Sequence, residues 1–476
     1  MTQDGCFDGP PASPPLAVAP MSPGRNQLGR SDPWALVLRV EGDRALTRLC
    51  VPGISIRWLE GRSGRYRTMK LRCTAVIAVA VGVVCAVAGC AASPRGFHAA
   101  THVPVAADGL TAQDPQAASL SSGMARHYEY VFPDGVMYVY DIDHGHRLVQ
   151  RVRLPGVKGV RGVAASPRTH MLYISYGAFG GPGTTGRLLA YNLLAGSVVY
   201  DRSYSRGIDS MAIDPAGDRI YMPDGESSRD GVWSVIAARS GNVIGSINGG
   251  MSPHETVVGL SGKRVYLGGR NWPYLEVAST ATDRVFKRIG PLESGVRPLT
   301  INGRETIAYT TATGLLGFQV SSITTGRVLF TIGFGSRFPL NRATFRSSAP
   351  SHGISLTPDE RQLWVLDAPN DYVHVFDVSQ VPLRRPRRIA DIRLAHSLPG
   401  DGWIQVSRSG CFVYVGDSGD VLSAQSFTPV AYLPALSSTK QSLEIDWHDG
   451  LPVATSTRTG LGYVTRGPDP PPPKCK

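Results

Sequence analysis

The stretch DSMAIDPAGDRIYMP, residues 209–223, contains the pattern that decides the fold of this chain. A short apolar strand is followed by a Pro/Gly/Asp turn, and then by a second strand that ends in an aromatic–aliphatic pair. The same order returns in RGVAASPRTHMLYIS (161–175), HETVVGLSGKRVYLG (254–268), SHGISLTPDERQLWVL (351–366) and DGWIQVSRSGCFVYVG (401–416). The chain is therefore built from internal repeats.

The spacing of the repeats indicates their architecture. Their aromatic residues are Tyr173, Tyr221, Tyr266, Tyr309, Trp364 and Tyr414, which lie 48, 45, 43, 55 and 50 residues apart. Further strand-like runs such as RLLAYNLLAGSVVYD follow most repeats, and no amphipathic helix pattern interrupts them. A period near 45 residues with four short strands per unit is typical of a β-propeller.

The two ends of the repeat region are incomplete in complementary ways. The run SLEIDWHDGLPVATS, residues 442–456, provides an inner strand pair, and VMYVYDIDHGHRLVQRVRLP, residues 136–155, provides outer strands. Joining them closes a ring and protects edge strands that an open array would expose. The sequence therefore predicts an all-β fold, a seven-bladed β-propeller whose N-terminal strands close the last blade.

Composition and motifs exclude several classes of protein. The chain has 476 residues and is 42% hydrophobic, which is too apolar for a disordered protein. Its 54 Gly and 36 Pro follow no three-residue period, so collagen is excluded. No CxxC or CxxCH motif supports structural zinc or c-type haem. The repeats also lack GxSxG, P-loop and HExxH signatures, which disfavours serine-hydrolase, P-loop nucleotide and zincin mechanisms.

Residues 69–89 have the anatomy of an export signal. MKLR precedes fifteen uncharged residues, 73–87, which as a helix would reach about 22 Å and fall short of a ~30 Å hydrocarbon core. The segment ends in VAGC, which resembles a lipobox and predicts lipidation of Cys90. The alternative is an ordinary cleaved signal. Residues 1–68 are interpreted as a misassigned start, or else as a disordered extension.

The predicted mature chain is an exported lipoprotein that faces the periplasm or the cell exterior. Residues 90–126 form a flexible tether, 127–466 the propeller and 467–476 a Pro-rich tail. The full chain carries +12, and residues 1–89 hold 11 Lys+Arg against 6 Asp+Glu, which leaves +7. That charge favours anionic lipid or wall polymer over nucleic acid. We expect a monomer that is membrane-bound through Cys90, with an envelope protein or wall polymer as partner. Cys411 and Cys475 either form a disulfide or stay as thiols.

The turns and strands resemble those of YVTN-type, YncE-like β-propellers of bacterial cell surfaces. The resemblance is carried by DPAG (214–217), TPD (357–359), VFDV (375–378) and the pairs Tyr173-Ile174, Tyr221-Met222 and Tyr414-Val415, and it covers about residues 128–464. The turns of the first and third repeats depart from the pattern. The resemblance implies a propeller at the cell envelope and no defined activity.

Twelve residues before each aromatic residue lies a position that is ionisable in five of six repeats. The residues there are Arg161, Asp209, His254, Arg297, His352 and Gly402, and the seventh unit gives Ser442. Because innermost strands begin around the central channel, we expect these side chains, together with Glu444, to form a polar funnel. Arginine forks suit carboxylate or phosphate, so the funnel predicts a small anionic ligand. The alternative is a structural ring of capping groups and ion pairs between blades.

Two further interpretations of the funnel stay open. His254 and His352, with a carboxylate from Asp209, Glu255 or Glu444, would be able to hold a divalent transition metal; no other cofactor is predicted. An enzyme would use His254 or His352 as general base, as a lactonase-like hydrolase or as a metal- or quinone-dependent oxidoreductase. Binding or scaffolding remains the leading interpretation.

Three other segments are interpreted from the sequence. The insertion at residues 334–350 is either a lid over the funnel or a long loop. The arginine run at residues 384–388 lies on the rim, either as a solvated loop or as a contact for anionic lipid or wall polymer. The motif DIDHG, residues 141–145, is expected to be a turn of the repeat and not a calcium loop.

Overall fold

The computed structural model describes residues 56–60, 65–69, 125–178 and 184–456. The chain divides into two units, Met1–Val105 and Ala106–Lys476. In the first unit β1 (Ile56–Glu60) and β2 (Arg65–Met69) form an antiparallel hairpin. Strands therefore occur within residues 1–68, where the sequence suggests no strand period. Apart from Met69, the predicted signal and Cys90 lie outside the described residues. No helix among the described residues is long and apolar enough to cross a membrane.

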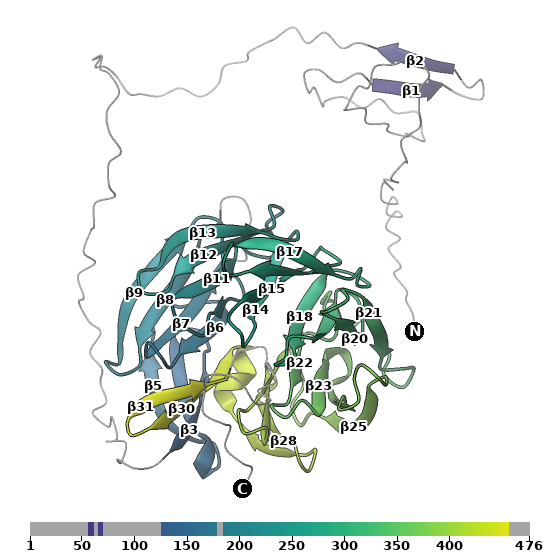
Figure 1. Cartoon of the computed structure of the whole chain (residues 1–476). Coiled ribbons are helices and arrows are strands. Elements are labelled where there is room, and N and C mark those ends of the chain that lie inside the picture. Colours follow the sequence, from purple (N-terminus) through teal and green to yellow (C-terminus); the bar gives the residue numbers. More distant parts are fainter. Residues whose placement is uncertain (1–55, 61–64, 70–124, 179–183, 457–476) are drawn as a thin grey trace, which may run out of the picture. The chain divides into compact units, whose positions relative to one another are not determined.

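The second unit is a seven-bladed β-propeller, as the sequence predicts (Figure 1). Six blades are antiparallel sheets of four strands that follow one another in the chain. Their strands are β6 (Val160–Ser166), β7 (Met171–Gly177), β8 (Gly186–Asn192) and β9 (Ser197–Tyr204); β10 (Ala212–Ile213), β11 (Arg219–Pro223), β12 (Val232–Ala237) and β13 (Asn242–Asn248); β14 (Pro253–Val258), β15 (Arg264–Gly269), β16 (Leu275–Ser279) and β17 (Arg284–Ile289); β18 (Val296–Ile301), β19 (Ile307–Ala312), β20 (Gly317–Ser322) and β21 (Val328–Gly333); β22 (Ile354–Leu356), β23 (Gln362–Asp367), β24 (Tyr372–Asp377) and β25 (Arg387–Arg393); and β26 (Trp403–Val406), β27 (Phe412–Gly416), β28 (Asp420–Ser423) and β29 (Pro429–Tyr432).

The seventh blade joins the two ends of the propeller. It contains β3 (Arg126–Val131), β4 (Val136–Asp141), β5 (Arg147–Arg153), β30 (Ser442–His448) and β31 (Leu451–Thr455), in the order β31-β30-β3-β4-β5. The predicted closure is confirmed, because β3 pairs with β30 along its whole length. The predicted division of strands differs: the N-terminal stretch contributes three strands, and the C-terminal stretch contributes the inner strand β30 and an additional fifth strand, β31.

The repeated aromatic residues form an equivalent buried layer in every blade. Each pairs with a residue of the inner strand and with a third-strand residue that directly precedes a β-bulge. Tyr130 occupies this place in the seventh blade, since it pairs with Leu443 and with Val139, and the bulge follows Val139. The seventh aromatic residue therefore comes from the N-terminal strand β3. Because Tyr130 pairs with Leu443, the residues of β30 that correspond to those of the other inner strands differ from the ones that the sequence alignment suggests.

The core lies in the seams between neighbouring blades. The residue before each aromatic residue is apolar and fully buried in six blades, as Leu172, Ile220, Val265, Ala308, Leu363 and Val413. The seventh blade has Glu129 at this place, and Glu129 is also fully buried. Burial of apolar side chains stabilises the other seams. The seam at the joint between the chain ends instead contains a carboxyl group.

Candidate functional site

The starts of the innermost strands bring polar side chains together at one end of the central channel. The equivalent position, three residues before the inner-strand partner of each aromatic residue, is occupied by Arg161, Asp209, His254, Arg297, His352, Gly402 and Lys440. The register of β30 therefore replaces the predicted Ser442 with Lys440. Five of the six predicted ligand-binding residues lie in this group, which we call the axial cluster together with the loop residues that contact it.

Asp209, at the start of the second blade, contacts a residue of the first blade and a residue of the third. Its carboxylate lies 3.3 Å from the Arg161 guanidinium, and it accepts a hydrogen bond from His254 Nδ1 at 2.9 Å. Both Asp209 and His254 are almost completely buried. A buried carboxylate is costly without partners, and these two groups provide them. The alternative interpretation from the sequence, that these residues form ion pairs between blades, agrees with this geometry.

Glu226 lies among three arginines and was not predicted from the sequence. It comes from the loop between β11 and β12, and its carboxylate lies 2.8 Å from Arg270, 3.2 Å from Arg161 and 3.7 Å from Arg297. Arg270, which directly follows β15, was also missed. Both residues lie in connections whose path the strand period does not specify. The cluster therefore holds a carboxylate by the forked groups that were expected to bind one.

Arg297 is a buried cation at the centre of the axial cluster, 3.7 Å from the Glu226 carboxylate. Its guanidinium donates hydrogen bonds to Thr313 Oγ1 at 3.0 Å and to the hydroxyl of Ser348. Burial and the neighbouring positive charge of Arg270 lower the pKa of Arg297 to about 10. An additional negative charge at this place would therefore stabilise the protonated guanidinium.

His254 and His352 face each other across the channel. Their Nε2 atoms lie 3.4 Å apart, and their ring planes are tilted by 34°. His352 Nδ1 donates to the carbonyl oxygen of Gly402 at 3.0 Å, and its ring packs edge-on against Trp403. Burial lowers the pKa of His352 well below its usual range. His352 is thus a neutral imidazole near neutral pH.

The insertion at residues 334–350 reaches the axial cluster. Ser348 accepts hydrogen bonds from Arg270 and Arg297, and Ser347 donates to Asp401 Oδ2 at 3.0 Å. At its start, Phe334 and Phe338 pack against the buried His374. These contacts show that the insertion reaches the site and packs against it. The insertion both anchors in the fifth blade and contributes groups to the site.

The sixth and seventh blades add a second ion pair. Lys440 contacts Asp401 directly and lies 4.0 Å from Asp417. Burial opposes ionisation of Asp401, but the ion pair with Lys440 holds the pKa of its carboxyl well below the usual range. The cluster thus combines four cations, Arg161, Arg270, Arg297 and Lys440, with four carboxyl groups, Asp209, Glu226, Asp401 and Asp417.

The predicted residue Glu444 belongs to a different group. It lies on β30 at a place where other blades have apolar residues, and its Oε2 accepts from the backbone N–H of Arg408 at 2.6 Å. Asp446 forms an ion pair with the buried Arg408 at 3.2 Å. Glu129 lies directly across from Glu444 in the β3–β30 ladder. Burial raises the pKa of Glu129 to about 8, and burial and Asp446 raise that of Glu444.

The DIDHG turn, the arginine run and Cys411 form contacts within the protein. Ile142–His144 is a 3₁₀ turn in which Asp143 accepts from His127 and Asp141 from His144, so the expected turn is confirmed. Within the arginine run, Arg385 donates to the Thr331 carbonyl, Arg387 pairs with Asp377 at 3.0 Å, and Arg388 donates to the Phe334 carbonyl. Cys411 is disulfide-bonded, and all other cysteines lie outside the described residues.

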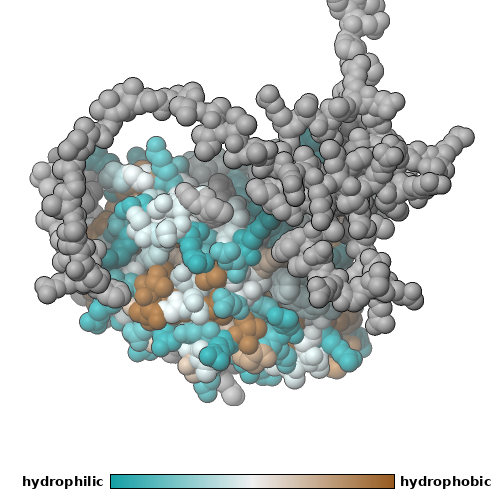
Figure 2. Space-filling model, turned by 90° about the horizontal axis from the view of Figure 1, so that it is seen from above, coloured by the Kyte–Doolittle hydropathy of each residue, from teal (hydrophilic) through white to brown (hydrophobic). Residues whose placement is uncertain are grey.

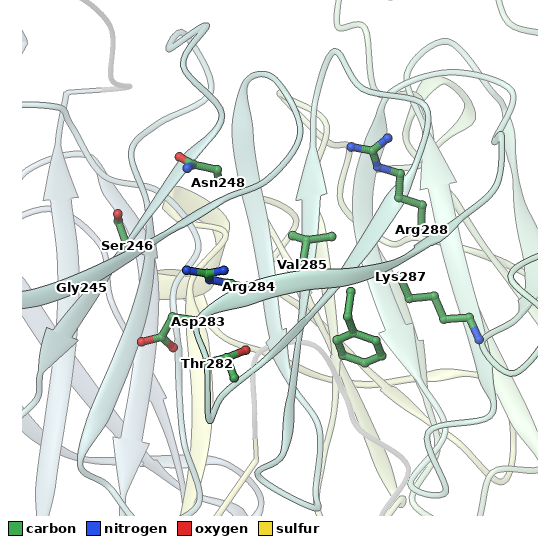
Figure 3. A pocket seen from close by; sticks show the side chains of 10 residues that line it. Gly245, Ser246, Asn248, Thr282, Asp283, Arg284, Val285, Lys287 and Arg288 are labelled. Carbon is green, nitrogen blue, oxygen red and sulfur yellow. The ribbon is translucent and has the colours of Figure 1, made fainter.

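A separate hollow of about 940 Å³ lies on the circumference, between the outer strands β13 and β17 (Figure 3). Ser246 and Asn248 line one side, and the stretch from Thr282 to Arg288 lines the other. Exposed apolar side chains on outer strands include Val199, Val243 and Phe286. Figure 2 shows hydrophobic patches on this side of the propeller separated by hydrophilic ones. The hollow has no buried ionisable group among its lining residues, unlike the axial cluster.

Comparison with known proteins does not assign the chain to a family. No family model and no curated protein matches the chain. Among solved structures, the chain is similar to a chain of Kuenenia stuttgartiensis hydrazine synthase, with 17% identity, a TM-score of 0.44, and coverage of 64% of this chain and 88% of that chain. The site must therefore be interpreted from its own residues.

Proposed function

We propose that this protein is a cell-envelope lipoprotein whose propeller binds a small anionic ligand at the axial cluster. The observation that carries the proposal is the Glu226 carboxylate held by Arg161, Arg270 and Arg297. An internal carboxylate on a connecting loop occupies the place that a carboxylate or phosphate ligand would take. The lowered pKa of Arg297 gives a reason why additional negative charge would be favourable there.

An anion should stabilise the folded full chain. We expect the melting temperature to rise with added succinate or inorganic phosphate, and the rise to disappear in Arg297→Gln. Arg387→Gln is the matched control, because Arg387 is an exposed arginine paired with Asp377 on an outer strand. Differential scanning fluorimetry with increasing anion at constant ionic strength measures the effect.

Glu226→Gln should strengthen anion binding, whereas Arg297→Gln should abolish it. A gain of binding cannot result from misfolding, so this variant keeps the test valid if Arg297→Gln fails to fold. Removing the internal carboxylate takes one negative charge away from beside three guanidinium groups, so anions should bind at least several-fold more tightly, as measured by calorimetry. No binding by wild type and Glu226→Gln, or weaker binding by Glu226→Gln, would refute the anion site.

The membrane anchor is a proposal that rests on the sequence. The lipobox-like VAGC ending, together with the resemblance to YVTN-type surface propellers, supports an exported protein attached through Cys90, with an envelope protein or wall polymer as partner. Expression with radiolabelled palmitate should label the wild-type chain, and Cys90→Ala should lose the label and leave the membrane fraction. An unlabelled wild-type chain would contradict the anchor.

A further inference from the structure

We infer that His254 and His352 form a binding site for a divalent transition metal ion, with one Nε2 ligand from each. The two imidazoles come from the third and fifth blades, and both are almost completely buried. Their Nε2 atoms approach to 3.4 Å. The site is distinct from the arginines that hold Glu226, and its test needs no anion.

The hydrogen bonds at the other ring nitrogens fix the tautomers. His254 Nδ1 lies 2.9 Å from the Asp209 carboxylate, and His352 Nδ1 lies 3.0 Å from the Gly402 carbonyl oxygen. Both partners accept hydrogen bonds, so each Nδ1 carries a proton, and an Nε2 that carries none presents a lone pair. Metal-bound histidines are held by the same kind of outer hydrogen bond to a carboxylate or a carbonyl group.

Two facing lone pairs repel each other unless a proton or a metal ion lies between them. Among the described residues neither Nε2 has another hydrogen-bond partner. A shared proton would make an N–H···N bond, but hydrogen bonds from N–H groups usually span about 2.7–3.2 Å. Two nitrogens bound to one tetrahedral metal ion, at about 2.0–2.1 Å each, lie about 3.3–3.4 Å apart. The observed separation matches the metal geometry.

The surroundings suit an exchangeable ion. The carboxylates of Asp209 and Glu226 lie 2.9 Å and 3.9 Å from His254 Nδ1, on the far side of that ring from its Nε2, and would offset part of the charge of a divalent ion. The ring centroids are 5.6 Å apart, and a modest turn of the rings would direct both lone pairs at one ion. Imidazole ligands favour Zn²⁺, Co²⁺, Ni²⁺ and Cu²⁺ over Mg²⁺ and Ca²⁺, and water would complete the coordination.

Cobalt titration of the full chain tests the inference. The protein is first treated with chelator and its thiols are alkylated, so that cysteines do not bind the ion. We expect about one equivalent of Co²⁺ to bind, with visible d–d absorption and a rise in melting temperature. His254→Gln and His352→Gln should each weaken binding at least tenfold. His396→Gln should not, because the half-exposed His396 pairs with the buried Asp420 and contacts no second imidazole among the described residues.

Two outcomes would overturn the inference. One is the absence of stoichiometric Co²⁺ or Zn²⁺ binding by wild-type protein, which would leave a shared proton as the link between the rings. The other is binding that both histidine variants retain. Because the titration contains no succinate or phosphate, failure here would leave the anion proposal intact, and failure of the anion experiment would not affect this one.

Discussion

A chain that ends at Gln441 is expected to lose cooperative unfolding, whereas a chain that ends at Ser456 is expected to keep it. The first lacks β30, which pairs with β3 and contributes Leu443, Ile445 and Trp447 to the core. Truncating one such side chain to alanine costs about 2–5 kcal/mol, and a whole domain has only about 5–15 kcal/mol of stability. Thermal denaturation followed by circular dichroism measures the effect.

The comparison isolates the joint between the chain ends. Both truncated chains lack residues 457–476, and both are measured with the disulfide of Cys411 reduced. They then differ by β30, β31 and the turn between them. If the chain ending at Gln441 melted cooperatively within a few degrees of the longer one, the pairing of β3 with β30 would not be what holds the ring together.

Replacing Glu129 should remove much of the protein's loss of stability between about pH 4.5 and pH 8. Burial raises the pKa of Glu129 to about 8, above the value of an exposed glutamate. The folded state therefore holds a proton that the unfolded state has released, and the free energy of unfolding falls as pH rises from about 4.5 to about 8. The effect of this one group is on the order of 5 kcal/mol.

Glu129→Gln cannot ionise, so its free energy of unfolding should fall less between pH 5 and pH 8 than that of wild type. Glu129→Leu restores the apolar residue that the other blades have at this place. At pH 8 it should be more stable than both wild type and Glu129→Gln. Residual pH dependence is expected from Glu444 and Asp446, whose pKa values are also raised. Exposed Glu293→Gln is the control. Parallel pH profiles for wild type and Glu129→Gln would contradict this prediction.

Much of the fold could be predicted because the repeat is local. Each blade is a meander, so an alternating strand, a turn and a terminal aromatic residue specify its inner strands without long-range information. The joint between the ends was harder. The sequence does not reveal Tyr130 as the seventh aromatic residue, because Tyr130 precedes its inner strand by more than 300 residues. Counting twelve residues on from Ser442 leads instead to Ala454 of β31, which is not aromatic.

The site shows the same division. Arg161, Asp209, His254, Arg297 and His352 occupy one repeat position, and the structure brings them to one end of the channel. The sequence does not indicate Lys440, because only the pairing of Tyr130 with Leu443 shows that Lys440 occupies the same repeat position. Glu226, Arg270 and Asp401 lie on connections, where no period predicts which way a side chain points. A carboxylate within a connection between two charged repeat positions is the one sequence signal that could have indicated Glu226.

By itself the sequence determined that this chain forms seven radial sheets and that charged residues begin the innermost strands, because both properties repeat at a nearly constant spacing. The tertiary structure decided which chain end supplies which strand of the last blade, which loop carboxylate meets the arginines, and that the two histidines meet nitrogen to nitrogen. These outcomes depend on the register between strands far apart in the chain and on the directions of individual side chains. Neither is encoded in a local pattern, since both are settled only when the ring closes.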